Sequence, residues 1–393
     1  MNQSFVDQLP AILVGGPPHS GKSVLIYSLT KSLRAIGIEQ HYTLRACPDG
    51  EGDWSNEAPQ PLVTEIRIKG EWTDRWVQRI RRDINNRQLP LLVDVGGRPT
   101  PEQMAMFSDC THAILLTPDA ESREWWSAAV SESGLTLLAD LHSDLHGENR
   151  LDRVEPVVTG VLAGLERSNR AQGPAYDALV QRLAALLSAN QTELKEYYLA
   201  EAPKEIDCVV DLDRLAVTLG YAEPNAKVHW EPEQLPSLLD YLPQATPLAV
   251  YGRGTNWVQA ALARYAAPAV YASFDPRLGW VQARSLSQQE IPAENPLQVK
   301  KDETDVRTHL EFFIPETYLD YDELATLVVP PVSAGKGLIL SGKLPLWLYT
   351  SLAVTYAYTP WLAVYQPNAN GAILVASQDA TRPVGSVMMM GRI

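Results

Sequence analysis

The chain has 393 residues, of which 45% are hydrophobic and 20% are charged, as in an ordinary soluble globular protein of two or three domains. The formal net charge of −14 argues against non-specific binding of long nucleic acid, which requires a broad basic face, but it allows a small phosphorylated ligand. The sequence shows no signal-peptide pattern and no apolar run as long as a membrane span, and its three scattered cysteines suit reduced thiols. We therefore expect a cytoplasmic protein without a membrane partner.

A glycine-rich loop follows an apolar, strand-like stretch at residues 11–14 and precedes an apolar helical stripe that starts at Val24. Its sequence, GPPHSGKS, has the spacing GxxxxGKS. Backbone N–H groups of such a loop surround phosphates, while Lys22 reaches the β- and γ-phosphates and the Ser23 hydroxyl ligates Mg²⁺. Nucleotide binding is therefore predicted for Gly16, Ser20, Gly21, Lys22 and Ser23.

An acidic residue at the end of a later strand completes this site. The apolar stretch 89–93 leads to Asp94, which two glycines follow closely. At the carboxyl end of a strand beside the loop, Asp94 would bind the nucleotide's Mg²⁺ through water or orient an attacking water. We also expect helices at 74–86 and 121–133, a capped helix start at 100–103, and strands at 113–117, 135–139 and 156–161. This alternation predicts a mostly parallel sheet wrapped by helices.

Residues 1–166 resemble P-loop NTPases through these two motifs. The DVGG and ILLTPD stretches are more similar to the branch of dethiobiotin synthetase and MinD, or to small kinases, than to ring-forming motors. The resemblance implies ATP or GTP with Mg²⁺ as cofactors, and Asp94 as the catalytic residue of an NTPase. We expect a helical connector at 167–203, with helices at 176–187 and 193–201.

Two stretches in the second half of the chain, 249–281 and 335–373, are similar to one another at a spacing of about ninety residues. Each has a strand, a glycine followed by a basic residue, a helix with an early tryptophan, and a strand that ends in Asp-Pro or Gln-Pro. With one residue inserted, the aligned pairs are Gly252 with Gly342, Arg253 with Lys343, Trp257 with Trp347, Leu262 with Leu352, Tyr265 with Tyr356, Phe274 with Tyr365, and Asp275 with Gln366. A repeat of this length suits a tandem duplication. We predict two small α/β modules, 204–293 and 294–393, that form a pseudo-dimer within one chain.

The stretch GLILSGKLPLWLYTSLAVTYAYTPWLAVYQP resembles the core of the small ring nucleases of type III CRISPR systems. The resemblance extends back to Leu297, and a form fused to a P-loop domain, often labelled AAA, belongs to the same family. It implies a fold distantly related to CARF domains, a role in antiviral defence, and binding of cyclic tetra-adenylate with hydrolase activity on the ring. It also implies a homo-oligomer assembled around the ligand.

The second copy places Ser341, Gly342 and Lys343 at a strand end before a helix, where N–H groups and a cation can meet a phosphate. Tyr349 and Tyr358 are candidates for stacking on adenines, with core packing as the alternative, whereas the two aligned tryptophans are better interpreted as core residues. Ligand binding is therefore predicted for Gly252, Arg253, Ser341, Gly342, Lys343, Tyr349, Tyr358 and Gln366.

Ring opening requires the ribose 2′-hydroxyl to attack the neighbouring phosphate, with an acid or base and a cation in support. The family's pattern contains histidines and an Asp-Pro-Arg sequence. The first module keeps Asp275 and Arg277, and the second keeps the Lys343 loop, so these three are the candidate catalytic residues, with Mn²⁺ as a candidate cofactor. Other residues stand at the family's histidine positions: Val354, Tyr358 and Gln378 in the second module, and Ala263, Ala267 and Leu286 in the first.

The sequence leaves three outcomes open: slow cleavage at a hybrid site, binding without cleavage, or a merely structural ion pair between Asp275 and Arg277. We interpret His309, on an alternating strand, as structural. The leading hypothesis is a type III CRISPR accessory protein that binds cyclic tetra-adenylate and a nucleoside triphosphate. One alternative is a P-loop kinase or synthetase whose C-terminal half binds a metabolite or makes an oligomer interface. Another is a non-enzymatic, nucleotide-gated assembly switch.

Overall fold

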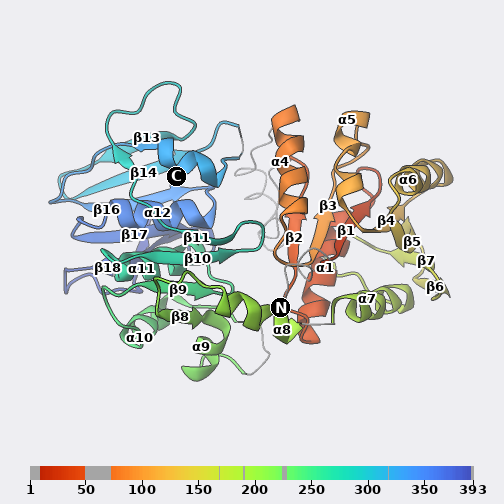
Figure 1. Ribbon diagram of the computed structural model, residues 1–393, viewed down its shortest axis with the longest axis horizontal. Coiled ribbons are helices and arrows are strands. Elements are labelled where there is room, and N and C mark those ends of the chain that lie inside the picture. Colours follow the sequence, from red (N-terminus) through yellow and green to blue (C-terminus); the bar gives the residue numbers. More distant parts are fainter. Residues whose placement is uncertain are drawn as a thin grey trace. The chain divides into compact units, whose positions relative to one another are not determined.

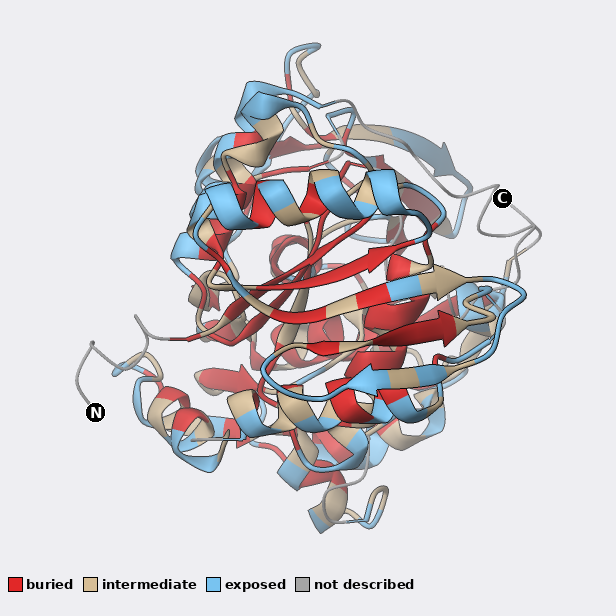
Figure 2. Cartoon of the chain, turned by 90° about the vertical axis from the view of Figure 1, so that its right-hand side faces the viewer, coloured by how far each residue is buried: buried red, intermediate tan, exposed pale blue. Residues whose placement is uncertain are grey.

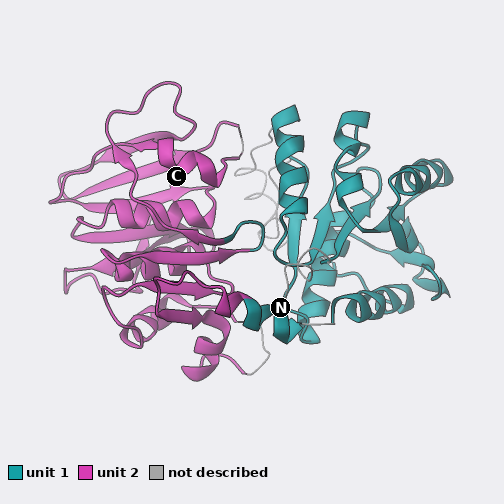
Figure 3. Ribbon diagram, in the orientation of Figure 1, with its two compact units in different colours: residues 1–197, 276–279 teal, residues 198–275, 280–393 magenta. Residues whose placement is uncertain are grey.

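A computed structural model describes residues 9–48, 72–167, 169–188, 191–223, 228–316 and 318–390. The chain divides into two compact units (Figure 3). Unit 1 comprises residues 1–197 and 276–279, and unit 2 comprises residues 198–275 and 280–393. Both units mix helices with parallel-rich sheets, so the expected α/β class is confirmed. Within the ranges given above, no helix is both long enough and apolar enough to cross a membrane.

Unit 1 is built on a seven-stranded sheet in the order β2-β3-β1-β4-β5-β7-β6 (Figure 1). Neighbouring strands run parallel except for β6 with β7, as the alternating sequence pattern predicted. The strands are β1 (Ala11–Gly15), β2 (Tyr42–Arg45), β3 (Leu91–Asp94), β4 (His112–Thr117), β5 (Thr136–Asp144), β6 (Arg150–Arg153) and β7 (Val158–Ala163). The helices are α1 (Lys22–Ala35), α4 (Asp74–Asn85), α5 (Pro101–Met104), η2 (Phe107–Asp109), α6 (Ala120–Glu132), α7 (Pro174–Leu187) and α8 (Gln191–Ala200), the last of which crosses into unit 2.

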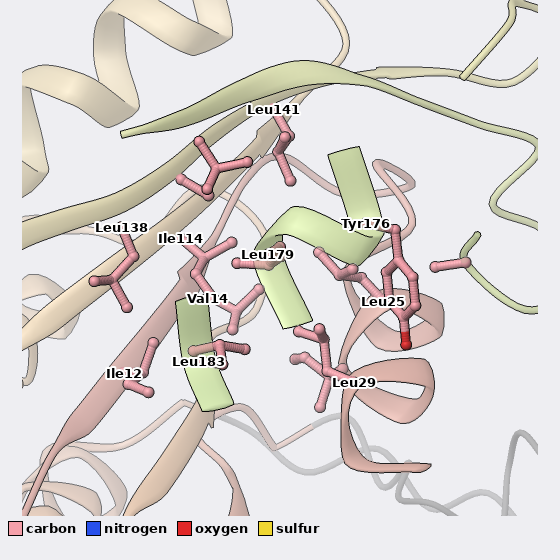
Figure 4. Close-up of a cluster of buried hydrophobic side chains, with 14 of the residues drawn as sticks. Ile12, Val14, Leu25, Leu29, Ile114, Leu138, Leu141, Tyr176, Leu179 and Leu183 are labelled. Carbon is pink, nitrogen blue, oxygen red and sulfur yellow. The ribbon is translucent and has the colours of Figure 1, made fainter. Parts of the chain in front are cut away.

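Helices cover both faces of this sheet because alternate residues of β1 point to opposite sides. Ile12 and Val14 lie in one buried apolar cluster with residues of α1 and α7 (Figure 4). Gly15 faces the other way, toward the buried ring of Trp126 in α6. Figure 2 shows the resulting pattern of buried central strands and helices with one exposed side. Helix α7, which we assigned to a connector, therefore belongs to the core of unit 1, which extends beyond the boundary expected at residue 166.

The order of the strands creates a topological switch point at β1. After β1 the chain adds β2 and β3 on one side, and it then crosses to add β4 on the other side. Open α/β sheets bind ligands at the carboxyl ends of their strands at such a point. The loop that follows Gly15 and the acidic residue Asp94 at the end of β3 both lie at this edge of the sheet.

Unit 2 contains a four-stranded sheet (β11-β10-β9-β8), a six-stranded sheet (β13-β14-β16-β17-β18-β19) and a two-stranded sheet (β12-β15). Its strands are β8 (Cys208–Asp211), β9 (Leu248–Tyr251), β10 (Tyr271–Asp275), β11 (Gly279–Gln282), β12 (Ser287–Gln288), β13 (Gln298–Glu303), β14 (Arg307–Phe313), β15 (Val328–Val329), β16 (Gly337–Gly342), β17 (Trp361–Gln366), β18 (Gly371–Ser377) and β19 (Val387–Met389). Its helices are α9 (Leu212–Thr218), η3 (Pro232–Gln234), α10 (Leu235–Asp240), α11 (Asn256–Ala266), η4 (Tyr321–Thr326), α12 (Leu346–Thr355) and η5 (Pro367–Ala369).

The two larger sheets share an arrangement of four strands and one helix. Strands β8, β9, β10 and β11 follow one another across the first sheet as β14, β16, β17 and β18 do across the second. Helix α11 connects β9 to β10, and α12 connects β16 to β17. Leu248 pairs with Tyr271 in the first sheet, and Leu338 pairs with Leu362 in the second. The strands before the helix are thus ninety residues apart and those after it ninety-one, which agrees with the single insertion in the sequence alignment.

We call β8–β11 with α11 the first module and β13–β19 with α12 the second module. A tyrosine at the end of each helix donates to the segment that precedes the module's central strand. Tyr265 donates to the carbonyl oxygen of Leu242 at 3.3 Å, and Tyr356 donates to that of Pro330 at 2.7 Å. The two helices pack against each other, and the aligned tryptophans are both 2% exposed, as expected for core residues.

Two glycines near the start of β16 give a matched test of the packing in the second module. A Cβ on Gly337 would lie 1.7 Å from the buried indole of Trp361, whereas a Cβ on Gly335 would meet nothing within 4 Å. We expect Gly337→Ala to lower the free energy of unfolding by about 1–3 kcal/mol, because the rigid ring cannot move away. Gly335→Ala should change it by less than about 0.5 kcal/mol. Urea denaturation measures both, and equal effects would contradict this packing.

Candidate functional sites

The loop between β1 and α1 requires glycine at two positions. Gly16 and Gly21 have φ angles of 153° and 88°. A Cβ on Gly16 would lie 2.1 Å from the carbonyl oxygen of Leu116, and one on Gly21 would lie 2.6 Å from the Cβ of Leu165. Gly21 is also the N-cap residue of α1, which has 14 residues. The two glycines therefore let the chain turn directly from a buried strand into the N-terminus of a long helix.

The start of α1 is suited to an anion. In the part of the chain that the structure describes, no side chain caps this helix, and its first turn contains no acidic residue. Ser20 is 2% exposed, and its hydroxyl has no hydrogen-bond partner among the residues that the structure describes. Lys22 Nζ donates to the carbonyl oxygens of Gly16 and Pro17, both at 2.8 Å. Helix N–H groups, an unpartnered hydroxyl and an ammonium group thus gather in one turn, as a phosphate site requires.

Ser23 and Asp94 converge on one cationic atom. The strand registers place Asp94 beside Val14 of β1 and beside Arg45, the last residue of β2. Arg45 Nη1 donates to Asp94 Oδ2, and it also donates to Ser23 Oγ at 3.2 Å. The side chain of Asp94 is 3% exposed, so the ion pair is largely shielded from solvent. A hydroxyl and a carboxylate around one cation are donors that Mg²⁺ prefers, so the residues predicted for this metal fit it.

Each module of unit 2 has a glycine turn before its helix. Gly252 follows β9 with φ 99°, and Gly342 ends β16 with φ 133°. A Cβ on Gly342 would lie 2.1 Å from the carbonyl oxygen of Phe312, so no other residue fits there. The exposed residues Arg253 and Lys343 come next in the chain. Among the residues described, α11 and α12 both begin without a side-chain cap. At the start of α11, Asn256 Oδ1 accepts from the N–H of Trp257 at 2.9 Å, and in both modules the first turn of the helix closely follows a cation in the chain.

Tyr349 links the two turns. Its hydroxyl donates to the carbonyl oxygen of Gly342 at 2.6 Å and shares a hydrogen bond with the side chain of Asn256, at the start of α11. Tyr349 is 2% exposed, and its burial raises the pKa of the phenol. This burial favours core packing, the alternative to the stacking role. Tyr349 instead holds the two turns together.

Most of the other residues predicted to bind the ligand lie at the same edge of their sheets. Parallel strands end together, so Gln366 at the end of β17 reaches the level of Gly342, which Ser341 precedes in β16. By the same register argument, Asp275 at the end of β10 reaches the level of Gly252. The edge formed by the ends of β9, β10, β16 and β17 is therefore the candidate ligand surface of unit 2.

Tyr358 does not lie at this edge. It follows the C-terminus of α12, whose length of 10 residues separates it from the Lys343 turn by about 15 Å. Its hydroxyl donates to Gln288 Oε1 at 2.6 Å and to the carbonyl oxygen of Val332 at 3.1 Å. The structure therefore does not bring Tyr358 together with Lys343, and the role of Tyr358 in ligand binding stays a prediction.

Arg277 and Lys343 belong to different units. Arg277 lies among the residues 276–279 that group with unit 1, and Lys343 lies in unit 2. Within unit 1, Arg277 Nη1 is 3.8 Å from Asp83 Oδ2, and its guanidinium is 5.9 Å from the centre of the Tyr42 ring. The two basic residues of the hybrid site, one of the three outcomes left open, thus belong to separate units.

A histidine contacts the second turn through Ser341. His309 Nε2 and Ser341 Oγ share a hydrogen bond of 2.7 Å between neighbouring strands β14 and β16. His309 is 8% exposed, and its burial lowers the pKa of the imidazole, although the nearby carboxylates Glu311 and Asp302 oppose this shift. The imidazole is therefore neutral at pH 7. His309 is therefore a residue of β14 that also contacts the predicted ligand-binding sequence Ser341-Gly342-Lys343.

Three residues of these sites were not selected from the sequence as site residues: Arg45, Asn256 and His309. The rule that groups the carboxyl ends of parallel strands could have identified Arg45, and the helix start after a glycine turn could have identified Asn256. The contact of His309 depends on the register of β14 against β16, which local patterns do not reveal. Over the described ranges, no group of three or more His, Cys, Asp or Glu residues could hold a metal ion.

Comparison with known proteins gives two findings. Residues 312–389 match the model of a family described as CRISPR-associated protein (Cas_csx3), a segment that runs from the end of β14 to β19. This match supports a CRISPR-associated protein. The chain is also similar to an uncharacterized protein of Aquifex aeolicus (strain VF5), with 37% identity over 51 residues, or 13% of this chain and 46% of the relative. The match thus spans less than half of the relative's length.

The buried imidazole of His309 makes the stability of unit 2 depend on pH. Because its folded pKa lies below the ordinary value of about 6.5, the unfolded chain binds the proton more readily, and stability falls as the pH drops below about 6.5. His309→Gln removes this titration, so its stability should fall less than that of the wild type between pH 7 and pH 5. Denaturant midpoints across this range measure the difference. Exposed His146→Gln is the control, and parallel profiles for wild type and His309→Gln would contradict the assignment.

Proposed function

We propose that this protein is a type III CRISPR accessory protein whose paired modules bind cyclic tetra-adenylate and whose unit 1 binds a nucleoside triphosphate with Mg²⁺. Ring binding is supported mainly by the two helix starts, which have no side-chain cap and each follow a glycine turn and a basic residue. Asn256 and Tyr349 connect the two. The Cas_csx3 match covers the second of these turns and adds independent support.

The chemistry of the paired turns suits a cyclic oligonucleotide. Each turn offers helix N–H groups and a flexible cation, which can bind one phosphate without reading a base. Two such turns in tandem modules form a receptor with approximate twofold symmetry, and a ring with repeated phosphates is a matching ligand. In this proposal the two modules act together as a pseudo-dimer within one chain.

The proposal for unit 1 rests on the turn from β1 into α1. Gly16, Gly21 and Lys22 shape a phosphate cradle at a topological switch point, and Ser23 and Asp94 converge as metal donors. When bound, Mg²⁺ would neutralise phosphate charge during hydrolysis or phosphoryl transfer. The residues of the chain bind and orient the nucleotide, with Asp94 positioned to hold a metal-bound or attacking water.

Lys343 provides the main test of ring binding. Replacing it with alanine removes a charge-assisted hydrogen bond, so the Kd for cyclic tetra-adenylate in calorimetry should rise about tenfold or more. Lys336→Ala is the matched control, because Lys336 precedes the amino end of the same strand and pairs with Glu303 at 2.8 Å. Its affinity should equal that of the wild type. Wild-type protein that does not bind the ring at micromolar concentration would overturn the proposal.

Lys22 tests the nucleotide site separately. We expect Lys22→Ala to weaken binding of ATP or GTP with Mg²⁺ by about tenfold or more, because the loop loses its phosphate-binding ammonium. Binding can be followed with a fluorescent nucleotide, and the products separated by chromatography. A phosphorylated small molecule among the products would instead favour a kinase or synthetase. A change of oligomeric state without turnover would favour an assembly switch.

A further inference from the structure

Arg45 lies where the predicted metal ligands meet, and it belongs to neither of the two nucleotide-binding motifs. It ends β2, at the strand end directly beside Asp94. A single nitrogen of its guanidinium contacts both Asp94 Oδ2 and Ser23 Oγ. The Arg45 side chain is 21% exposed and that of Asp94 is 3% exposed, so the cation reaches inward from the rim of the sheet to a buried carboxylate.

A guanidinium and a Mg²⁺ ion cannot occupy this position together. Mg²⁺ would need close contact with the oxygens of Ser23 and Asp94, and one guanidinium nitrogen of Arg45 already donates to both of them. Asp94 requires a cation whether or not the site holds a metal, because an unpaired buried carboxylate is costly. The site is therefore neutralised by the chain itself when it holds no metal.

We propose that Arg45 is a tethered cation that occupies the metal position and makes metal binding conditional on nucleotide. This inference rests on the proposed nucleotide site. Ser23 and Asp94 alone offer two ligands, too few to displace a guanidinium that is attached to the same sheet. Nucleotide phosphates supply further oxygens for Mg²⁺ and a competing bidentate partner for the guanidinium. Arg45 then leaves Asp94 only when the phosphates are present.

Binding of Mn²⁺, observed through the loss of its free-ion electron paramagnetic resonance signal, tests this without any measurement of turnover. Wild-type protein should not bind Mn²⁺ at micromolar concentration alone, and when ADP is added it should remove more of the free-ion signal than the same concentration of ADP does without protein. Arg45→Gln keeps hydrogen-bonding capacity but removes the charge, so it should bind Mn²⁺ without nucleotide at least tenfold more tightly than the wild type. Adding Asp94→Asn to this variant should abolish the gain, because the metal then lacks its carboxylate ligand.

Arg81→Gln is the matched control, because Arg81 pairs with Asp109 at 2.6 Å in the same unit, away from the loop. It should behave as the wild type. Mn²⁺ binding by the wild type without nucleotide would overturn the inference, and so would an Arg45→Gln variant that gains no metal affinity. The wild-type measurement stands even if Arg45→Gln does not fold. If wild type binds no nucleotide while Arg45→Gln gains Mn²⁺, the nucleotide function and the dependence of the metal on nucleotide both fail, and only the occupation of the metal position by Arg45 stands.

Discussion

The close approach of a neighbouring strand's carbonyl oxygen to a glycine is the constraint on which both candidate sites depend. At Gly16 the oxygen belongs to Leu116, at Gly342 it belongs to Phe312, and in both cases a Cβ would lie 2.1 Å away. Each glycine also has a positive φ angle that other residues rarely adopt. The strand can therefore stay paired to its last residue and still turn at once toward a helix. The N–H groups of that helix are delivered to the carboxyl edge of the sheet, where ligands of parallel sheets bind.

This geometry gathers positive potential, and the chain balances it differently in the two units. In unit 1 the cations are held close: Lys22 donates to loop carbonyl oxygens, and Arg45 neutralises Asp94. In unit 2 the basic residues Arg253 and Lys343 are exposed. A buried ion pair makes a site selective, because a ligand that separates the pair must itself compensate the charge left unpaired. Exposed cations instead favour rapid capture of an anion.

Local sequence patterns were sufficient for several elements of unit 1. Helix α4 matches the apolar stripe from which it was predicted, and the capping box between Thr100 and Gln103 forms. The single insertion between the modules reappears in the strand registers.

Features that depend on contacts between distant parts of the sequence could not be predicted. The position of Tyr358 depends on which end of α12 faces the ligand edge, and the partner of His309 depends on how β14 pairs with β16. Helix α7 looked like a linker because its packing partners lie far away in the sequence.

The difference between exposed and buried groups bears on whether the proposed ring ligand would be cut or only bound. In the proposed function, recognition would draw on many groups at once, because two helix starts and two cations are available. Ring opening needs a proton acceptor within hydrogen-bond reach of the 2′-hydroxyl. His309 is neutral at pH 7 and able to accept a proton, but it is 8% exposed and can reach a ligand only through Ser341, which is itself 3% exposed. Cleavage in unit 2 would thus depend on one buried hydrogen bond, whereas binding depends on exposed and redundant contacts. This difference is the physical reason for placing recognition of the ring ahead of its cleavage in the proposed function.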